Sequence, residues 1–332
     1  MCHGRFKSVS VGRVVNISLI TPAGKQSQSG NRTTAVRWQR LLRALGHRVA
    51  VATDYDGAPA DLMIAIHAWR SAGAIMDFRE RFPKRPLIVA LGGTDINTFQ
   101  KTHPETTLKS MAIADALVGL HDRVCDAIPK RFCKKLHVIH QSAQPLTQRR
   151  APAKRWFEVC VIGHLREEKD PLRTAEAAAM LPATSRLRVI HLGKAHDKAW
   201  AAAARREMRR NPRYLWRDEV PGWAVRREFA RAHLMVLSSV QEGGANVIGE
   251  AITAGVPVIA SEIEGSVGLL GPNYQGYFPT GDTRALADRL ARAETDRDYL
   301  RTLARQCRAR AKLFRPAREK RAWRQLLAEV TH

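Results

Sequence analysis

The segment spanning residues 234–261, LMVLSSVQEGGANVIGEAITAGVPVIAS, constrains the fold more than any other part of the chain. Its first residues have the length and apolar content of a buried strand, which Gly243 and Gly244 end. Asn246 is a favourable N-cap for the helix that follows, Gly255 ends that helix, and a second apolar strand comes next. This order of strand, loop, helix and strand predicts a parallel α/β sheet.

Two carboxylates, Glu242 and Glu250, are separated by seven residues around this loop. Ligands collect at the carboxyl ends of parallel strands, where a helix N-terminus offers free N–H groups to a phosphate. The Gly-Gly-Ala loop lacks bulk, so a diphosphate can approach it closely. Glu250 leans toward the helix N-terminus and, if buried, needs donors such as ribose hydroxyls. The alternative is a solvated Glu242 and a Glu250 paired with an arginine, but the loop favours a sugar-nucleotide site.

The composition permits two domains and a substantial core. The chain has 332 residues, 45% of them hydrophobic, and no run of 18 apolar residues, so we predict no membrane-spanning helix. Five cysteines without a Cys-x-x-Cys pair indicate neither a disulfide framework nor a zinc site, which favours a reducing, cytoplasmic compartment. Residues 1–13 are basic without an apolar core, so we expect a disordered leader rather than a secretory signal.

The net charge of +24 raises the question of a polyanionic partner. The basic residues are spread along the chain, and no zinc-finger, helix-turn-helix or aromatic-interleaved RNA pattern accompanies them. A solvated, arginine-rich surface is therefore favoured, with nonspecific polyanion binding or membrane-surface association as alternatives. We expect no specific nucleic-acid partner, and the sequence leaves the oligomeric state open.

The chain consists of two runs of alternating strands and helices on either side of a linker. Residues 144–154, QPLTQRRAPAK, have two prolines and no periodicity, which is typical of a linker. Strands are expected at residues 14–20, 48–52, 62–66, 87–91, 116–120, 136–139, 157–162, 188–192, 234–237 and 257–260. A helical stripe near the C-terminus consists of Trp323, Leu326, Leu327 and Val330.

This organisation predicts four units. They are the leader of residues 1–13, a domain of residues 14–145, a domain of residues 155–312 and a final helix of residues 313–332. The first domain is expected to hold the acceptor and the second the nucleotide sugar. A single long sheet is the alternative architecture.

A second strand-to-helix turn, GHLREEKDP, opens at Gly163 after the first strand of the second half. Its Arg166 and Lys169 can direct cationic groups toward a departing diphosphate. The alternative is a surface turn with an ion pair to Glu167 or Glu168, because exposed pairs of this kind are common and weak.

The loop after the first strand combines N–H groups, hydroxyls and cations at a helix start, which suits an anion. Its candidate residues are Lys25, Gly30, Asn31, Arg32 and Thr33. The alternative is an ordinary capped helix. Its position at the end of a strand favours the binding function.

Further acceptor candidates follow the strands at residues 62–66 and 87–91. His67 can orient or polarise an acceptor, or it can be a structural histidine. Thr94 and Asp95 follow the next strand, where Asp95 can be a base or, more simply, a helix N-cap. Weaker candidates at a later strand end are His140, Gln141 and Ser142.

The stretch from Glu242 to Glu250, followed by AITAGVPVIASEIEG, resembles the Glu-x7-Glu signature of the retaining-type GT-B glycosyltransferases of family 4. The resemblance implies two Rossmann-like domains facing a cleft, with the last helix crossing back to the first domain. It implies that Glu242 contacts the transferred sugar and Glu250 the ribose. Family members usually carry Gly-Arg-Leu-x-x-x-Lys at the second turn. Here His164 replaces that arginine and Lys169 matches, so Arg166 is the candidate substitute.

These considerations define two sets of residues. The donor-binding set is Gly163, Arg166, Lys169, Glu242, Gly243, Gly244, Ala245, Asn246 and Glu250. The catalytic set is Glu242, His67, Arg166 and Lys169. We expect no metal and no cofactor.

Six stretches together carry a narrower resemblance, to the selenosugar synthases of bacterial selenoneine biosynthesis. They are SGNRTTAVRWQRLLRALGHRV, DLMIAIHAWRSA, LGGTDI, VIHQSAQPL, VIGHLREEKDP and EGGANVIGEAITAGVPVIAS. The resemblance implies that UDP-glucose or UDP-N-acetylglucosamine is joined to selenophosphate, leaving a 1-seleno-β-sugar after phosphate loss.

Selenophosphate is a small polyanion and already a strong nucleophile, so its site needs cations and positioning more than a base. Lys25, Asn31, Arg32 and Thr33 can bind its oxygens. Two other functions remain open: a family 4 glycosyltransferase with a lipid or glycan acceptor, and a nonenzymatic polyanion-binding protein.

Overall fold

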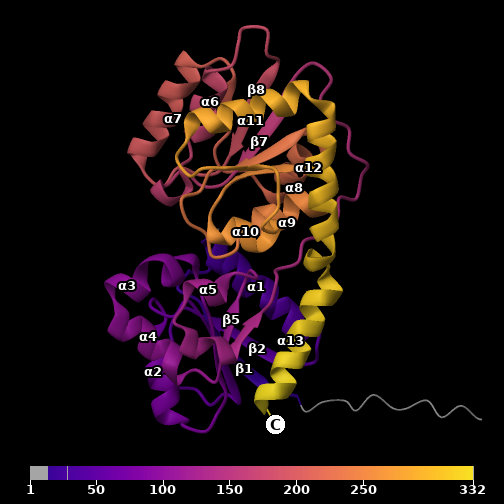
Figure 1. Cartoon of the computed structure of the whole chain (residues 1–332). Coiled ribbons are helices and arrows are strands. Elements are labelled where there is room, and N and C mark those ends of the chain that lie inside the picture. The colour runs from indigo at the N-terminus through magenta and orange to yellow at the C-terminus, as the bar shows by residue number, and fades with distance from the viewer. Residues whose placement is uncertain (1–13, 28, 332) are drawn as a thin grey trace, which may run out of the picture.

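The computed structural model describes residues 14–27 and 29–331, which form two α/β domains stacked end to end (Figure 1). Each contains a parallel six-stranded sheet, in the order β2-β1-β3-β4-β5-β6 in the first and β12-β11-β10-β7-β8-β9 in the second. Continuous apolar runs form these strands because helices cover both faces of a parallel sheet. The two sheets confirm the predicted doubled architecture and exclude a single long sheet.

The ten expected strands are all present, with ends that differ by up to two residues. The first sheet contains β1 (Asn16–Ile20), β2 (Arg48–Ala52), β3 (Leu62–Ile66), β4 (Leu87–Ala90), β5 (Ala116–Gly119) and β6 (Leu136–Val138). The second contains β7 (Phe157–Ile162), β8 (Leu187–Leu192), β9 (Tyr214–Trp216), β10 (Leu234–Leu237), β11 (Val258–Ser261) and β12 (Tyr277–Phe278). The sequence prediction missed β9 and β12, which are too short to show a periodic pattern.

Helices connect the strands and cover both sheets. The helices of the first domain are α1 (Gly30–Arg43), α2 (Ala72–Arg81), α3 (Gln100–Thr102), α4 (Pro104–Ile113) and α5 (Val124–Ala127). Those that follow are α6 (Arg173–Ala179), α7 (Lys198–Arg210), α8 (Gly222–Arg231), α9 (Asn246–Thr253), α10 (Glu264–Leu270), α11 (Thr283–Thr295), α12 (Arg297–Arg310) and α13 (Pro316–Thr331). Short 3-10 and π turns are η1 (Asp95–Phe99), η2 (Lys130–Lys135), η3 (Glu167–Lys169) and η4 (Ala311–Phe314).

The start of α9 corrects one prediction. Ala245, in extended conformation, is the N-cap, and Asn246 is the first helical residue. The reason is the preceding Gly244, whose φ of 124° completes the turn one residue earlier than the capping preference of asparagine suggests.

The C-terminal helix crosses back to the first domain, as the resemblance to GT-B glycosyltransferases implies. Figure 1 shows α13 continuing from the second domain along the side of the first. Trp323 is fully buried, and its ring meets that of Trp38 at 4.8 Å between centroids. The buried carboxylate of Glu319 accepts hydrogen bonds from Trp38 Nε1 at 3.0 Å and from the backbone N–H of Ser142 at 2.8 Å. An apolar stripe and a fully satisfied buried charge therefore fix this helix.

Residues 144–154 contain no helix or strand, as expected of a linker. The N–H groups of Ala151 and Ala153 donate to carbonyls at the end of α8, so this segment is attached to the second domain. The leader expected at residues 1–13 lies outside the described residues.

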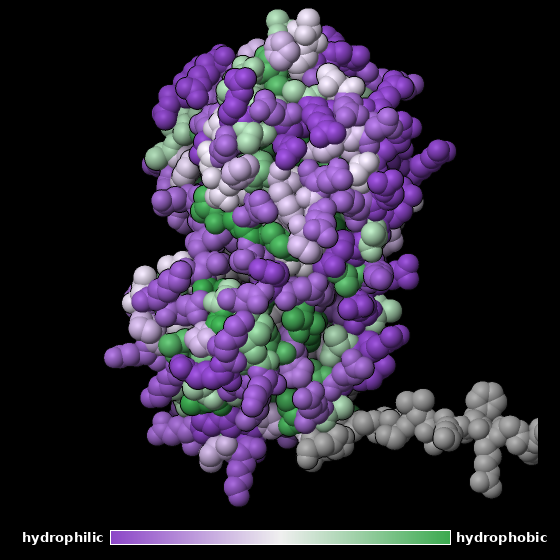
Figure 2. All heavy atoms as spheres, viewed as in Figure 1, coloured by the Kyte–Doolittle hydropathy of each residue, from purple (hydrophilic) through white to green (hydrophobic). Residues whose placement is uncertain are grey.

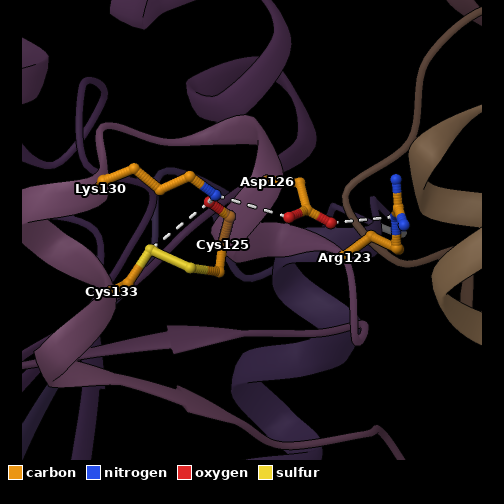
Figure 3. Close-up of a disulfide and its surroundings, with 5 residues drawn as sticks. All are labelled: Arg123, Cys125, Asp126, Lys130 and Cys133. Carbon is orange, nitrogen blue, oxygen red and sulfur yellow. Dashed lines mark hydrogen bonds and ion pairs between the residues drawn. A yellow bond between two sulfur atoms is a disulfide. The ribbon is translucent and has the colours of Figure 1, made fainter.

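The cysteines contradict the sequence prediction. Cys125 in α5 and Cys133 in η2 form a disulfide, with their Cα atoms 5.5 Å apart (Figure 3). Sequence spacing did not reveal the pair, because η2 turns the chain back beside α5. Disulfides are typical of oxidising compartments, so this bond gives no support to a reducing cytoplasm, which stays a prediction. Cys160 and Cys307 are buried thiols.

Charged and polar side chains cover most of the face seen in Figure 2, which narrows between the two lobes. The arginines of α7 belong to this hydrated surface: Arg205, Arg206, Arg209 and Arg210 are exposed. Among the described residues, no helix is both long enough and apolar enough to cross a bilayer.

Candidate active site between the two domains

A cavity of about 600 Å³ lies between the domains, at the carboxyl ends of β1, β3 and β4 on one side and of β7, β8 and β10 on the other. Ligand sites of parallel sheets are found at this edge. The predicted residues that line it are Gly30, Asn31, His67, Thr94, Gly163, Arg166, Lys169, Glu242, Gly243, Gly244, Ala245 and Asn246. Predicted residues outside its lining are Lys25, Arg32, Thr33, Asp95 and Glu250.

Two residues predicted to act on the donor are paired with each other. Lys169 Nζ in η3 forms an ion pair with Glu242 Oε1, and Ser239 Oγ donates to the same oxygen at 2.7 Å. The Glu242 side chain is 10% exposed and that of Lys169 is 21% exposed. A carboxylate at this depth requires such partners, so the pair keeps both charges in place without a ligand.

Arg166 lines the same cavity. It also has a neighbouring glutamate, so both of its predicted roles, a cation for a diphosphate and a partner in a surface ion pair, are represented. Its Nε is 3.1 Å from Glu168 Oε1, yet this buried nitrogen has no hydrogen bond of good geometry. The ion pair is therefore loose, and the guanidinium is available to an anion that enters the cavity.

The Gly163 turn rests on a buried histidine that the sequence analysis did not identify. His191 Nε2 is 3.0 Å from the carbonyl of Gly163, and His191 Nδ1 is 2.9 Å from Tyr214 Oη. Burial lowers the pKa of His191 to about 4. The neutral ring thus donates to Gly163 and accepts from Tyr214. His164 also lines the cavity and accepts from the Lys194 N–H at 3.2 Å.

Glu250 lies in the second turn of α9, behind the residues that line the cavity. Burial raises the pKa of its carboxyl group, while Arg37 and Arg226 act in the opposite direction. Glu250 is half-buried, no hydrogen bond to its carboxylate forms among the described residues, and a buried nitrogen of Arg37 has no partner. Polar groups away from solvent usually have hydrogen-bond partners. The hydroxyl group of a bound ligand could supply the partner that the Glu250 carboxylate lacks.

Glycine loops from the two domains meet and narrow the cavity. A Cβ on Gly93 would lie 2.5 Å from the backbone nitrogen of Gly243, and one on Gly244 would lie 2.5 Å from Leu120. Real Cβ atoms do not approach so closely, so only glycine fits here. Thr98 Oγ1 donates to Gln241 Oε1 at 3.1 Å next to this contact. The loops carrying Thr94 and Glu242 are therefore held against each other.

The first-domain wall presents hydroxyl and N–H groups at the start of α1. Ser27, Ser29, Gly30 and Asn31 line the cavity, and Ser29 Oγ is buried without a partner. The sequence analysis missed the serines, although Ser-x-Ser before a helix start is a recognisable signal for N–H and hydroxyl groups. Arg70, which also lines the cavity, supplies a cation that was not among the predicted residues.

Asp95 is neither an N-cap nor a free base. It is 1% exposed, and its Oδ1 lies 2.7 Å from His67 Nδ1. Its two oxygens also accept from the N–H groups of Ala68 at 2.8 Å, Trp69 at 3.0 Å and Gly92 at 2.8 Å. The carboxylate faces the His67 loop because that loop offers more donors than the start of η1.

Of the three weaker candidates, Gln141 alone lines the cavity, where it donates to Thr34 Oγ1 at 2.8 Å. His140 Nε2 lies 3.2 Å from Asp122, whose pKa falls to about 2 through His140 and then Arg310. Ser142 binds Glu319 of α13. Arg310 of α12 is 2.7 Å from Asp122, so this pair links the two domains, while the contact of Ser142 with Glu319 links the first domain to the crossover helix.

The sequence of the second domain identifies the family. Residues 146–313, half of the chain, match the model of the family described as glycosyl transferases group 1. The chain belongs to this family. No curated protein matches its sequence.

Solved structures show the same fold. HepE of Anabaena, in complex with UDP and glucose, superposes with a TM-score of 0.74 at 14% identity, covering 95% of this chain and 100% of that one. Sucrose-phosphate synthase from Thermosynechococcus elongatus gives a TM-score of 0.74 at 18% identity, covering 94% and 99%. A glycosyltransferase from Rickettsia africae gives 0.73 at 14% identity, covering 96% and 98%. The predicted GT-B fold is confirmed.

Proposed function

We propose that this protein transfers a sugar from UDP-glucose or UDP-N-acetylglucosamine to selenophosphate, as a step of selenoneine biosynthesis. The family membership supports glycosyl transfer, and the bound UDP of HepE supports a uridine nucleotide at the equivalent cleft. The six sequence stretches that resemble selenosugar synthases support the acceptor. The products are UDP and, after phosphate loss, a 1-seleno-β-sugar.

The observation that carries the choice of acceptor is the contact between two glycine loops across the cavity. The contact between Gly93 and Gly243 narrows the cavity, whereas a long glycan or lipid needs an open groove. The space left faces hydroxyls, the N-terminus of α1 and the guanidinium of Arg70. These groups suit a compact anion.

The donor is assigned to the second-domain wall. Arg166 and Lys169, with the backbone from Gly243 to Asn246, neutralise the diphosphate, and Glu242 holds the sugar. The unpartnered carboxylate of Glu250 accepts the ribose hydroxyls. When a diphosphate enters, Lys169 has a second anion to bind, so Glu242 is released toward the sugar hydroxyls.

The reaction requires charge positioning more than proton transfer. Selenium attacks the anomeric carbon, the bond from that carbon to the UDP oxygen breaks, and its electron pair stays on the diphosphate. Cations preorganised around the leaving group stabilise that developing charge. Attack opposite to the leaving group gives a β-product from an α-linked donor. Oriented binding between the two walls of the cavity supplies much of the remaining rate enhancement.

Product analysis tests this function. The purified protein is incubated with each UDP-sugar and selenophosphate, with inorganic phosphate and thiophosphate as matched anions. We expect UDP release with selenophosphate and a mass spectrum showing the selenium isotope pattern on a hexose or N-acetylhexosamine. UDP release without any selenium-containing sugar, or turnover only with a glycan or lipid acceptor, would contradict the proposal.

A further inference from the structure

The first-domain wall contains a proton-transfer array that the transfer step does not use. His67 Nδ1 lies 2.7 Å from Asp95 Oδ1, and His67 Nε2 lies 2.8 Å from Thr94 Oγ1. Asp95 and His67 are 1% and 2% exposed, while His67 and Thr94 both line the cavity. A hydroxyl, an imidazole and a carboxylate in this order form the arrangement in which a base removes a proton from an oxygen.

The contacts fix the state of the imidazole. The Asp95 carboxylate at 2.7 Å requires a proton on Nδ1. The backbone N–H of Arg70, 3.2 Å from the same nitrogen, would instead require a lone pair there. The contact with Asp95 is shorter and charge-assisted, so it determines the tautomer, and Nδ1 of His67 carries the proton. Nε2 then has a lone pair and accepts from Thr94 Oγ1. A proton passed from Thr94 would create an imidazolium directly beside the Asp95 carboxylate.

The surroundings hold this array rigidly. His67 has a φ of 81°, a conformation that non-glycine residues rarely adopt. Three backbone N–H groups donate to Asp95, which fixes the position of its carboxyl group. The ring of Trp69 stacks on Phe99 at 4.1 Å behind the histidine. Strain that is maintained by so many contacts, at the wall of a cavity, is typical of functional sites.

We infer that Thr94, His67 and Asp95 catalyse the loss of phosphate in a second step within the same cavity. This inference rests on the proposed function, because the transfer step leaves a sugar joined through selenium to a phosphoryl group. Water donates a proton to Thr94 Oγ1 as Thr94 passes its own to His67 Nε2, and the water oxygen attacks phosphorus. The P–Se bond breaks, its electron pair leaves with selenium, and the proton returns from His67 to the selenolate. The products are inorganic phosphate and the 1-selenosugar.

The test measures the ratio of inorganic phosphate to UDP released in reactions quenched within seconds. Thr94→Val removes the hydroxyl at nearly constant volume, and Thr94→Ser retains it as the matched control. We expect a ratio near one for the wild type and for Thr94→Ser, and a ratio lower by roughly tenfold or more for Thr94→Val. In that variant, ³¹P NMR should show a phosphorus coupled to selenium. A ratio near one in Thr94→Val would overturn the inference.

A second measurement needs no variant. The phosphorylated selenosugar, prepared chemically, is mixed with UDP and wild-type protein. Faster phosphate release than in buffer alone supports the second step, and equal rates overturn it. If the wild type releases no UDP with selenophosphate, the proposed function itself fails, and the prepared compound still tests the array independently.

Discussion

The two walls of the cavity handle charge differently. On the second-domain wall, Lys169 is paired with Glu242 and Arg166 lies beside Glu168, so opposite charges are present before any ligand arrives. On the first-domain wall, hydroxyls and N–H groups dominate, and the buried carboxylate of Asp95 is committed to backbone and His67. The cations of the second-domain wall can exchange partners when an anion binds, whereas the Asp95 carboxylate of the first-domain wall is held by three backbone N–H groups. We therefore expect the second-domain wall to contribute mainly through ligand binding and the first-domain wall through the fixed positions of its side chains.

The largest effect is expected where α13 braces the first-domain wall. Trp323→Ala should lower the free energy of unfolding of that domain by about 3–5 kcal/mol, because it removes a fully buried ring from the contact with Trp38. Denaturant titration followed by fluorescence measures this change in the free energy of unfolding. Trp223, which is 66% exposed on α8, supplies the control Trp223→Ala. Equal losses in the two variants would contradict the packing assigned to α13.

The donor wall should respond in catalysis rather than in stability. Lys169→Ala removes a cation from the expected diphosphate position and leaves Glu242 with Ser239 as its partner. We expect kcat/KM for the UDP-sugar to fall by roughly 10²–10³-fold. The exposed Lys198 on α7 gives the control Lys198→Ala, which should stay close to wild type. Measurement of steady-state UDP release with each variant tests this expectation, and equal values of kcat/KM would contradict it.

The contact between the walls can be broken at one position. Gly93→Ala places a Cβ against the backbone of Gly243, so the loops must separate. We expect activity with selenophosphate to fall by about tenfold, since a shift of about 1 Å can cost more than that. In Gly73→Ala on α2 the added Cβ meets no atom within 4 Å, so activity should be retained. Activity of Gly93→Ala equal to that of Gly73→Ala would show that the contact between the Gly93 and Gly243 loops is unnecessary for activity.

The smallest effect concerns pH. Burial lowers the pKa of His121 and of His191 to about 4, so between pH 6.5 and 4 the unfolded chain binds protons that the folded chain excludes. Stability therefore rises with pH in this window, by up to about 1.4 kcal/mol per pH unit for each histidine. Raised carboxyl pKa values at Glu228 and Glu250 act in the opposite direction.

The contribution of one histidine is obtained by difference. His191→Gln should flatten the dependence of unfolding free energy on pH relative to wild type, whereas His103→Gln, at an exposed position, should leave it unchanged. Denaturant titrations at several pH values between 4 and 6.5 provide the comparison. An identical slope in His191→Gln would mean that His191 takes up a proton in the folded protein.

The fold was predictable because long apolar strands followed by glycine leave a periodic record in the sequence. The strand-to-helix turns at Gly163 and Gly243 were recognisable for the same reason. Sequence spacing could not reveal contacts between distant strand ends. The pairing of Lys169 with Glu242 and the meeting of Thr94, His67 and Asp95 depend on which strands are neighbours. The Cys125–Cys133 disulfide likewise depends on a short turn without periodicity.

The choice between a compact anion and a large acceptor is the central claim, and one assay compares them directly. UDP release is measured under identical conditions with selenophosphate, with an oligosaccharide and with lipid vesicles that carry acceptor hydroxyls. The narrowed cavity and its anion-binding groups predict saturable, rapid release with selenophosphate and only background release with the other two. Rapid release with the oligosaccharide or the vesicles, and none with selenophosphate, would contradict the account.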